Sequence, residues 1–230
     1  MAQADPSRTE AGHGPPAAGP FSLELPDKGA FVSQATAYWC VPAAMQTMID
    51  LIDDEQPDRS RRTQAALYDL GRENSTDRPT GQGIEPEGWA EGLNLSGSGP
   101  YVVHIEPTRR RAIRAAAEAI RLTERPVGLV GWRGAHSWVM SGFEATADPR
   151  ASTDFRVTRA VVNDPLYPHG NAVWGSSPSP GQAISLGALE REFAPRRMNN
   201  RLGGLSTTLG GKYVLVLAYE VDLTIWSAAL

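Results

Sequence analysis

The arrangement of apolar residues along this chain changes near its middle, from helical spacing to short segments rich in valine, leucine and aromatic residues. The segment "VPAAMQTMIDLID" places Ala44, Met48 and Leu51 on one side at helical spacing, and Pro42 is tolerated in a first turn. Further helices are expected over residues 60–73, 83–95 and 108–126. The first half of the chain is therefore predicted to be mostly helical.

The ends of these helices carry recognisable signals. Ser60 and Thr108 are residue types that accept hydrogen bonds from the free N–H groups of a first turn. Pro86 suits the start of the third helix, whereas Gly71 and Pro126 are expected to end the second and fourth.

The second half has the composition of β-structure. Segments rich in valine, leucine and aromatic residues predict strands at residues 126–132, 137–145, 155–164 and 212–223, with a short helix at 185–193 before the last strand. Helices that precede strands in this way favour an α+β fold with an antiparallel sheet. No internal repeat is apparent.

Composition narrows the class of protein. The 230 residues are 41% hydrophobic and 21% charged, which suits one domain over residues 21–230 preceded by a disordered Pro- and Gly-rich tail at 1–20. The net charge of −4 gives no reason to expect a nucleic acid or an anionic membrane as partner. No apolar stretch is long enough to span a membrane, and the first residues do not resemble a secretory signal, so the cytoplasm is the expected location. The oligomeric state is left open.

The chain has one cysteine, Cys40, which excludes an internal disulfide and a cysteine-rich zinc site. Cys40 stands just before a predicted helix, where unpaired N–H groups stabilise a thiolate. Position alone favours the alternative of a small buried hydrophobic residue, because free cysteines are often buried. Other residues must decide between the two.

Two polar residues suggest partners for the thiol. Gln34 precedes Cys40 by six residues and could donate to an oxyanion, although it could equally be an ordinary loop residue. His136 starts an apolar strand after a Gly-containing turn and could act as a general base, or it could be purely structural. The other histidines fit less well, since His104 lies inside a predicted strand and His169 in a loop.

The segment "VVNDP" supplies a candidate third member of the site. Asn163 and Asp164 end an apolar strand, and either could hold the second nitrogen of His136 and fix its tautomer. The same residues also favour a turn, and the two interpretations are compatible.

In the order Gln34, Cys40, His136 and Asp164, the chain resembles the papain-like cysteine peptidases. Within that superfamily, "QATAYWCVPAAM", "GAHSWVMSGFEA" and "VVNDP" are most similar to stand-alone relatives of the bacteriocin-processing (double-glycine) peptidases. Val41 stands where that family has glycine after the cysteine.

The resemblance implies a papain-like α+β fold with the cysteine at a helix N-terminus packed on a C-terminal antiparallel sheet. It implies a thiol hydrolase acting on a peptide or protein, with Asp164 rather than Asn163 orienting the histidine and with no metal or organic cofactor. Trp39, Trp132 and Val41 are expected to line the substrate groove. Two alternatives remain: an acyl- or amide-transferring enzyme with the same residues, and a non-catalytic peptide-binding member of the fold.

Overall fold

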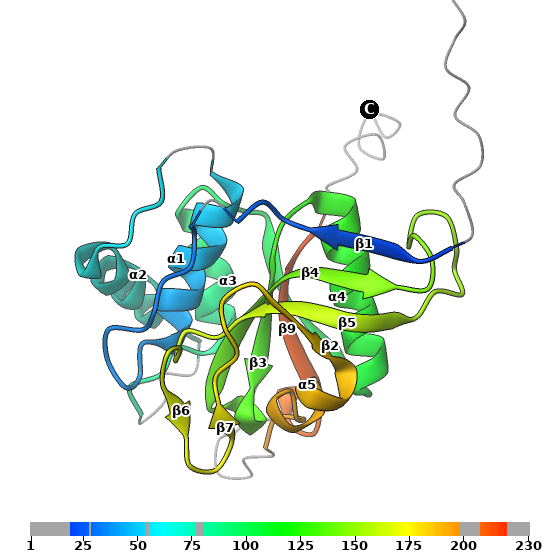
Figure 1. Cartoon of the computed structure of the whole chain (residues 1–230). Helices are drawn as coiled ribbons and strands as arrows, with labels where there is room; N and C mark the ends of the chain where they lie inside the picture. Colours follow the sequence, from blue (N-terminus) through cyan, green and yellow to red (C-terminus); the bar gives the residue numbers. More distant parts are fainter. Residues whose placement is uncertain (1–18, 28, 54–55, 77–80, 198–207, 220–230) are drawn as a thin grey trace, which may run out of the picture.

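The structure is a computed structural model, and it describes residues 19–27, 29–53, 56–76, 81–197 and 208–219. The disordered tail expected at 1–20 lies almost wholly outside the described residues, as does the end of the last predicted strand. Within the described residues, one seven-stranded antiparallel sheet is surrounded by α-helices (Figure 1). This confirms the α+β class.

Five helices are described, at α1 (Cys40–Ile52), α2 (Arg61–Glu73), α3 (Pro86–Leu95), α4 (Arg109–Thr123) and α5 (Leu186–Glu192). The described strands of the main sheet are β1 (Phe21–Glu24), β2 (Tyr101–Glu106), β3 (Val127–Gly131), β4 (His136–Ala145), β5 (Val157–Asn163), β8 (Gln182–Ser185) and β9 (Tyr213–Ala218). A 3₁₀ turn, η1 (Trp132–Gly134), joins β3 to β4, and a small hairpin is formed by β6 (Gly170–Asn171) and β7 (Gly175–Ser176).

The strand order is β2-β9-β3-β4-β5-β8, and β1 pairs with the far end of β4. The separation of helices from strands along the sequence is thus less complete than expected. Both β1 and β2 come from the helical half, and β2 lies beside β9 from the end of the chain. Antiparallel pairing of these distant segments buries strands that are too short to be stable alone.

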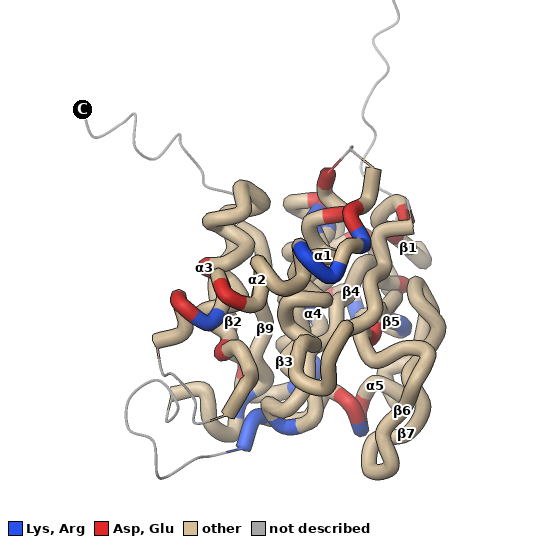
Figure 2. The backbone as a smooth tube through the Cα atoms, turned by 90° about the vertical axis from the view of Figure 1, so that its left-hand side faces the viewer, with Lys and Arg blue, Asp and Glu red and all other residues tan. Residues whose placement is uncertain are grey.

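Helices α1, α2 and α3 lie together at one end of the sheet, and α4 lies across one face, where it contacts β9 and β4 (Figures 1 and 2). α1 is the most enclosed helix, because nearly all of its residues are buried, including Met45 and Met48 at 0% exposure. Its first residue is Cys40, so a rigid, buried helix holds the only thiol of the chain.

The helix ends follow the predicted signals with one exception. Ser60 and Thr108 accept hydrogen bonds from the N–H groups of Thr63 and Arg111, as expected of N-caps. α2 runs past Gly71 to Glu73, so the prediction that Gly71 ends it was wrong.

The first turn of α1 differs from those of α2 and α4. Its N-cap residue, Trp39, makes no side-chain capping hydrogen bond, and Pro42 has no N–H to satisfy. No capping side chain of the N-cap residue therefore uses the N–H groups of this first turn.

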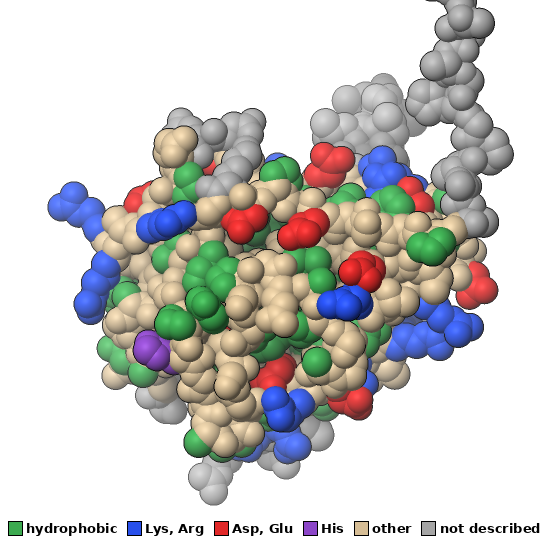
Figure 3. Space-filling view, in the orientation of Figure 1, with side chains coloured by type: hydrophobic (Ala, Val, Ile, Leu, Met, Phe, Trp, Pro, Cys, Tyr) green, Lys and Arg blue, Asp and Glu red, His purple; other side chains and the backbone are tan. Residues whose placement is uncertain are grey.

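Acidic and basic side chains are interspersed on the face of the molecule in Figure 3, without an extended area of one sign. Among the described residues, no helix is both long and apolar enough to cross a membrane.

Candidate active site

A pocket of about 330 Å³ opens beside the N-terminus of α1. Cys40 is partly exposed and lines it, together with Val41. The other lining residues come from the α1 and α3 N-terminal regions, from β3 and β4 and from the segment after α5: Ala37, Tyr38, Gly83, Ile84, Glu85, Pro86, Trp89, Val130, Gly134, Ala135, His136, Ser137 and Arg196. The residue that carries the thiol therefore borders a cavity that a ligand could enter.

His136 is the first residue of β4, and it lies in the same pocket as Cys40. Its Nε2 atom lies 2.7 Å from Oδ1 of Asp164, and the two side chains are only 3% and 1% exposed. Because Nε2 is engaged by the carboxylate, Nδ1 is the ring nitrogen left for the sulfur of Cys40, which is within hydrogen-bonding reach of the ring.

The structure separates the two candidates for the third position. Asp164 points to His136 and also accepts a hydrogen bond from the N–H of Leu166 at 2.9 Å. The side chain of Asn163 is instead hydrogen-bonded to Ser141 Oγ and to the N–H of Gly181, both at 3.0 Å. Consecutive residues at a strand end point in opposite directions, so only one of them can reach His136.

The charges of this group stabilise one another. Burial alone would raise the pKa of the Cys40 thiol, but hydrogen bonding and positive charge from His136, with hydrogen bonds from Ser137, bring it below the ordinary value. Burial alone would lower the pKa of His136, but hydrogen bonds and negative charge from Asp164 and Cys40 raise it to about 9. Each group thus stabilises the charged form of the other, which favours a thiolate–imidazolium pair.

Aromatic side chains fix the plane of the imidazole. The ring of Trp132 stacks on His136 with centroids 4.0 Å apart. Trp174 stacks on Trp132 in turn, with ring centroids 5.8 Å apart and an angle of 4° between the ring planes. Trp132 Nε1 donates to Oε2 of Glu192 at 2.7 Å, which anchors the indole to α5. Trp132 thus contacts the candidate base rather than lining the pocket.

The turn before His136 has an unusual backbone. Trp132 and Arg133 have φ values of 49° and 58°, and Gly134 follows at 97°. Left-handed conformations are unfavourable for residues with a Cβ, and such strain is concentrated at functional sites. Here this backbone places the Trp132 ring on the imidazole.

The other predicted site residues are placed as follows. The Gln34 side chain donates through Nε2 to the carbonyl of Thr36 at 2.8 Å and does not line the pocket, although its backbone N–H bonds to Pro165, next to Asp164. The ring of Trp39 packs on Tyr68 of α2 at 5.5 Å, outside the pocket lining. Because α2 covers this side of the α1 N-terminus, Trp39 faces a helix rather than the groove.

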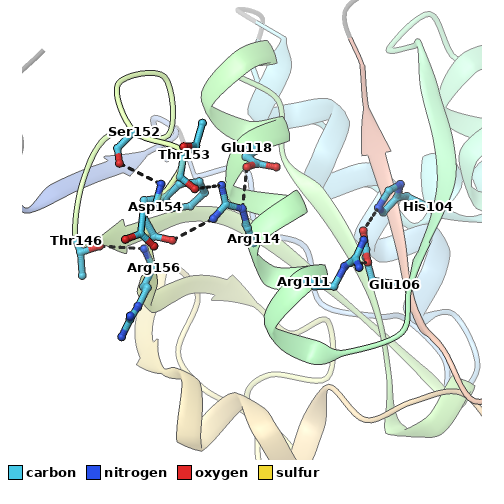
Figure 4. Close-up of polar contacts among 11 residues, drawn as sticks. His104, Glu106, Arg111, Arg114, Glu118, Thr146, Ser152, Thr153, Asp154 and Arg156 are labelled. Atoms are coloured by element: carbon cyan, nitrogen blue, oxygen red, sulfur yellow. Dashed lines mark hydrogen bonds and ion pairs between the residues drawn. The ribbon is translucent and has the colours of Figure 1, made fainter. Parts of the chain in front are cut away.

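The alternative histidines lie in other surroundings. His104 Nε2 is 3.1 Å from Oε1 of Glu106 on β2, and Arg111 of α4 pairs with the same carboxylate (Figure 4). His169 is exposed in the loop before β6. Neither lines the pocket that contains Cys40.

The sequence analysis missed three residues of the site: Ser137, Trp174 and Glu192. Ser137 directly follows His136, so its position in the strand was a signal that could have been used. Nothing in the sequence pointed to Trp174 or Glu192, because their contacts with Trp132 depend on how the chain returns after β5.

Among the described residues, no three His, Cys, Asp or Glu side chains gather as a metal site. Comparison of the chain with protein-family models, curated proteins and solved structures gives no match. The candidate function therefore rests on the geometry of the pocket and on the motifs around it.

Proposed function

We propose that this chain is a papain-like cysteine peptidase, a thiol hydrolase that cleaves a peptide or amide bond through an acyl-enzyme intermediate. The observation that carries the proposal is that Cys40 and His136 line one pocket, with the carboxylate of Asp164 2.7 Å from the imidazole behind them. A thiol, a base and a group that orients the base are the components of nucleophilic acyl transfer.

In the first half of the reaction, the Cys40 thiolate attacks the carbonyl carbon of the scissile bond. A C–S bond forms and the carbonyl electron pair moves to oxygen. The backbone N–H of Cys40 holds the oxyanion, and the Gln34 amide, which donates to Thr36 outside the pocket lining in the resting structure, adds a second donor once it turns into the pocket. The intermediate collapses as His136 gives its proton to the leaving amine, which leaves a thioester on Cys40.

In the second half, neutral His136 takes a proton from a water molecule as its oxygen attacks the thioester carbonyl. The C–S bond breaks, the carboxylic acid product leaves, and the thiolate–imidazolium pair is restored. Asp164 stays ionised throughout and keeps the imidazole in one tautomer and one orientation. Every step uses side chains of this chain and water.

The pocket has a shape and lining that suit a peptide. Ile84, Trp89 and Val130 supply apolar surface, and Glu85 and Arg196 form an ion pair within the lining. A pocket with mostly apolar walls and a few polar groups can hold a side chain next to the scissile bond. Val41 also lines the pocket, and its side chain narrows the space beside the nucleophile.

The test uses a peptide-based thiol-reactive probe on the full chain, with Cys40→Ala and His136→Ala as controls. We expect covalent labelling of Cys40 in the wild type, none in Cys40→Ala and much slower labelling in His136→Ala. A wild-type thiol that reacts no faster than a free cysteine would overturn the proposal and favour a non-catalytic peptide-binding protein.

A second measurement separates hydrolysis from transfer. Peptide substrates are digested in ¹⁸O-water with and without an added amine, and the products are analysed by mass spectrometry. We expect ¹⁸O in the new carboxyl group in both conditions. Exclusive formation of the amide product when amine is present would show a transferase instead.

A further inference from the structure

Ser137 carries a buried hydroxyl group whose role the proposed reaction does not explain. The residue is 1% exposed, and its Oγ makes no completed hydrogen bond to any described residue. Burying a hydroxyl without a hydrogen-bond partner is energetically costly, so native proteins seldom leave one unsatisfied. A partner for this hydroxyl is therefore expected in a working state of the protein.

The surroundings of Ser137 identify that partner. Ser137 lines the same pocket as Cys40 and His136, and hydrogen bonding from its hydroxyl and its backbone N–H would lower the pKa of the Cys40 thiol. The carboxylate of Asp164 is hydrogen-bonded to His136. The hydroxyl of Ser141, the next serine on β4, accepts a hydrogen bond from the side-chain amide of Asn163. The sulfur is thus the acceptor that Ser137 can reach.

The sheet leaves room for this contact. The pairing of β4 with β5 begins at Val139, which lies opposite Asn163. Among the described strands, β5 therefore does not pair with His136 and Ser137 at the start of β4, and that edge of β4 is open there. Side chains of consecutive strand residues point to opposite faces. A sulfur atom that interacts with the side chains of both His136 and Ser137 must therefore lie beside the open edge of β4, between the two faces of the sheet. At that edge the backbone N–H of Ser137 can also reach the sulfur.

We propose that Ser137 holds the resting thiolate of Cys40 with two hydrogen bonds, one from its hydroxyl and one from its backbone N–H. This inference rests on the proposed function, because it assigns a further residue to the same nucleophile. Ser137 is then a positioning residue that increases the thiolate population, alongside His136 and the N-terminus of α1.

One further observation agrees with this assignment. Gln34, the expected donor to the oxyanion, is engaged with Thr36 in the resting structure and is outside the pocket lining, so its side chain does not compete with Ser137 for the sulfur.

The test is the pH dependence of alkylation by iodoacetamide in the full chain. We expect Ser137→Ala to move the inflection of the rate upward by about 0.5 to 1 pH unit, which is a three- to tenfold slower reaction below the inflection. Ser137→Thr, which keeps a hydroxyl, should restore the wild-type profile. Ser141→Ala is the matched control, because Ser141 is a 3% exposed serine of the same strand and should leave the profile unchanged.

The outcomes separate this inference from the proposed function. An unchanged profile in Ser137→Ala beside a shifted profile in His136→Ala overturns the role of Ser137 alone. Unchanged profiles in both overturn the proposed function. If turnover falls in Ser137→Ala while the thiol inflection stays in place, Ser137 acts on the oxyanion and not on the thiolate, which also overturns the inference.

A measurement on the wild type covers the case in which Ser137→Ala does not fold. The backbone amide resonance of Ser137 should shift with the same inflection as Cys40 alkylation, and this shift should vanish once Cys40 is alkylated. A Ser137 amide that does not respond to thiol ionisation contradicts the proposed hydrogen bonds.

Discussion

The Nε2 atom of His136 lies 2.7 Å from Oδ1 of Asp164, in a setting where neither side chain is more than 3% exposed. A charge-assisted contact of this length in a nearly dry environment orients the imidazole and stabilises its protonated form. The backbone N–H of Leu166 holds the same carboxylate oxygen, so the acceptor cannot easily turn away. The remaining ring nitrogen is thereby aimed at Cys40.

Asp164→Asn tests the charge of this contact while keeping its shape. We expect the pKa of His136, about 9 in the wild type, to fall toward the ordinary value of 6.5, because the negative charge that favours the imidazolium is gone. The measurement is an NMR titration of the imidazole nitrogens, with Asp154→Asn in an exposed loop as control. A His136 midpoint that does not move would contradict the assignment of Asp164.

The contact between His136 and Asp164 makes the free energy of unfolding depend on pH. Folding raises the pKa of His136, so its stabilising contribution is complete below pH 6.5 and is lost as the pH rises through about 9. We therefore expect the free energy of unfolding of the wild type to decline over this range more steeply than that of His136→Gln, measured by urea denaturation. Parallel curves for the two proteins would refute the linkage.

Trp132→Ala removes the ring that stacks on His136 at 4.0 Å. Because such aromatic contacts contribute about 0.5–1.5 kcal/mol, we expect alkylation of Cys40 at neutral pH to slow by roughly two- to tenfold. Glu192→Gln, which weakens the anchor of the indole N–H, should give a smaller effect in the same direction. Trp39→Ala, outside the pocket lining, is the comparison variant and should leave the thiol reactivity unchanged.

Asp50 is a buried carboxyl group on α1, 6% exposed, and burial raises its pKa to about 6. An acid whose pKa is raised by folding destabilises the protein once it ionises, so stability should fall as the pH rises from about 4 to above 6. Asp50→Asn should remove this decline and raise the free energy of unfolding at pH 7.5 by up to about 2 kcal/mol. Denaturant titrations at pH 5 and 7.5 measure both effects, and a less stable variant at pH 7.5 would disprove the prediction.

Gly88 lets α3 approach α2 closely. A Cβ at this position would lie 2.2 Å from the backbone carbonyl oxygen of Gly71, which cannot move without shifting α2. We expect Gly88→Ala to lower the free energy of unfolding by about 1–3 kcal/mol, as is typical of overpacking. Gly81→Ala is the control, because no atom lies within 4 Å of its added Cβ, and equal melting temperatures for the two variants would count against this packing argument.

Local signals in the sequence were sufficient to predict much of the secondary structure. The helix that begins at Cys40, the caps at Ser60 and Thr108 and the strand that begins near His136 depend on residues within a few positions of one another. Capping and the periodicity of apolar residues act over one or two turns, so a single sequence contains them. The pairing of β2 with β9 joins segments distant in the chain, and no local pattern encodes it.

For the candidate site, the sequence by itself determined which residue types are present and placed Cys40 at a helix start and His136 at a strand start. The residue types alone left Asn163 and Asp164 open and only the family resemblance favoured Asp164; the tertiary structure places Asp164, and not the adjacent Asn163, against His136. The physical reason is that the direction of a side chain at a strand end depends on register and pleat, and a shift of one residue reverses it.

The same reason explains the roles of the remaining residues. The sequence analysis assigned Trp39 and Trp132 the same predicted role in the substrate groove. In the structure, Trp39 packs on Tyr68 of α2 and Trp132 packs on His136, because the backbone places the two rings beside different neighbours. Ser137 and Cys40 line the same pocket because α1 packs against β4. Contacts between segments far apart in the chain are set by packing of the whole domain, and the sequence pattern around each residue does not contain them.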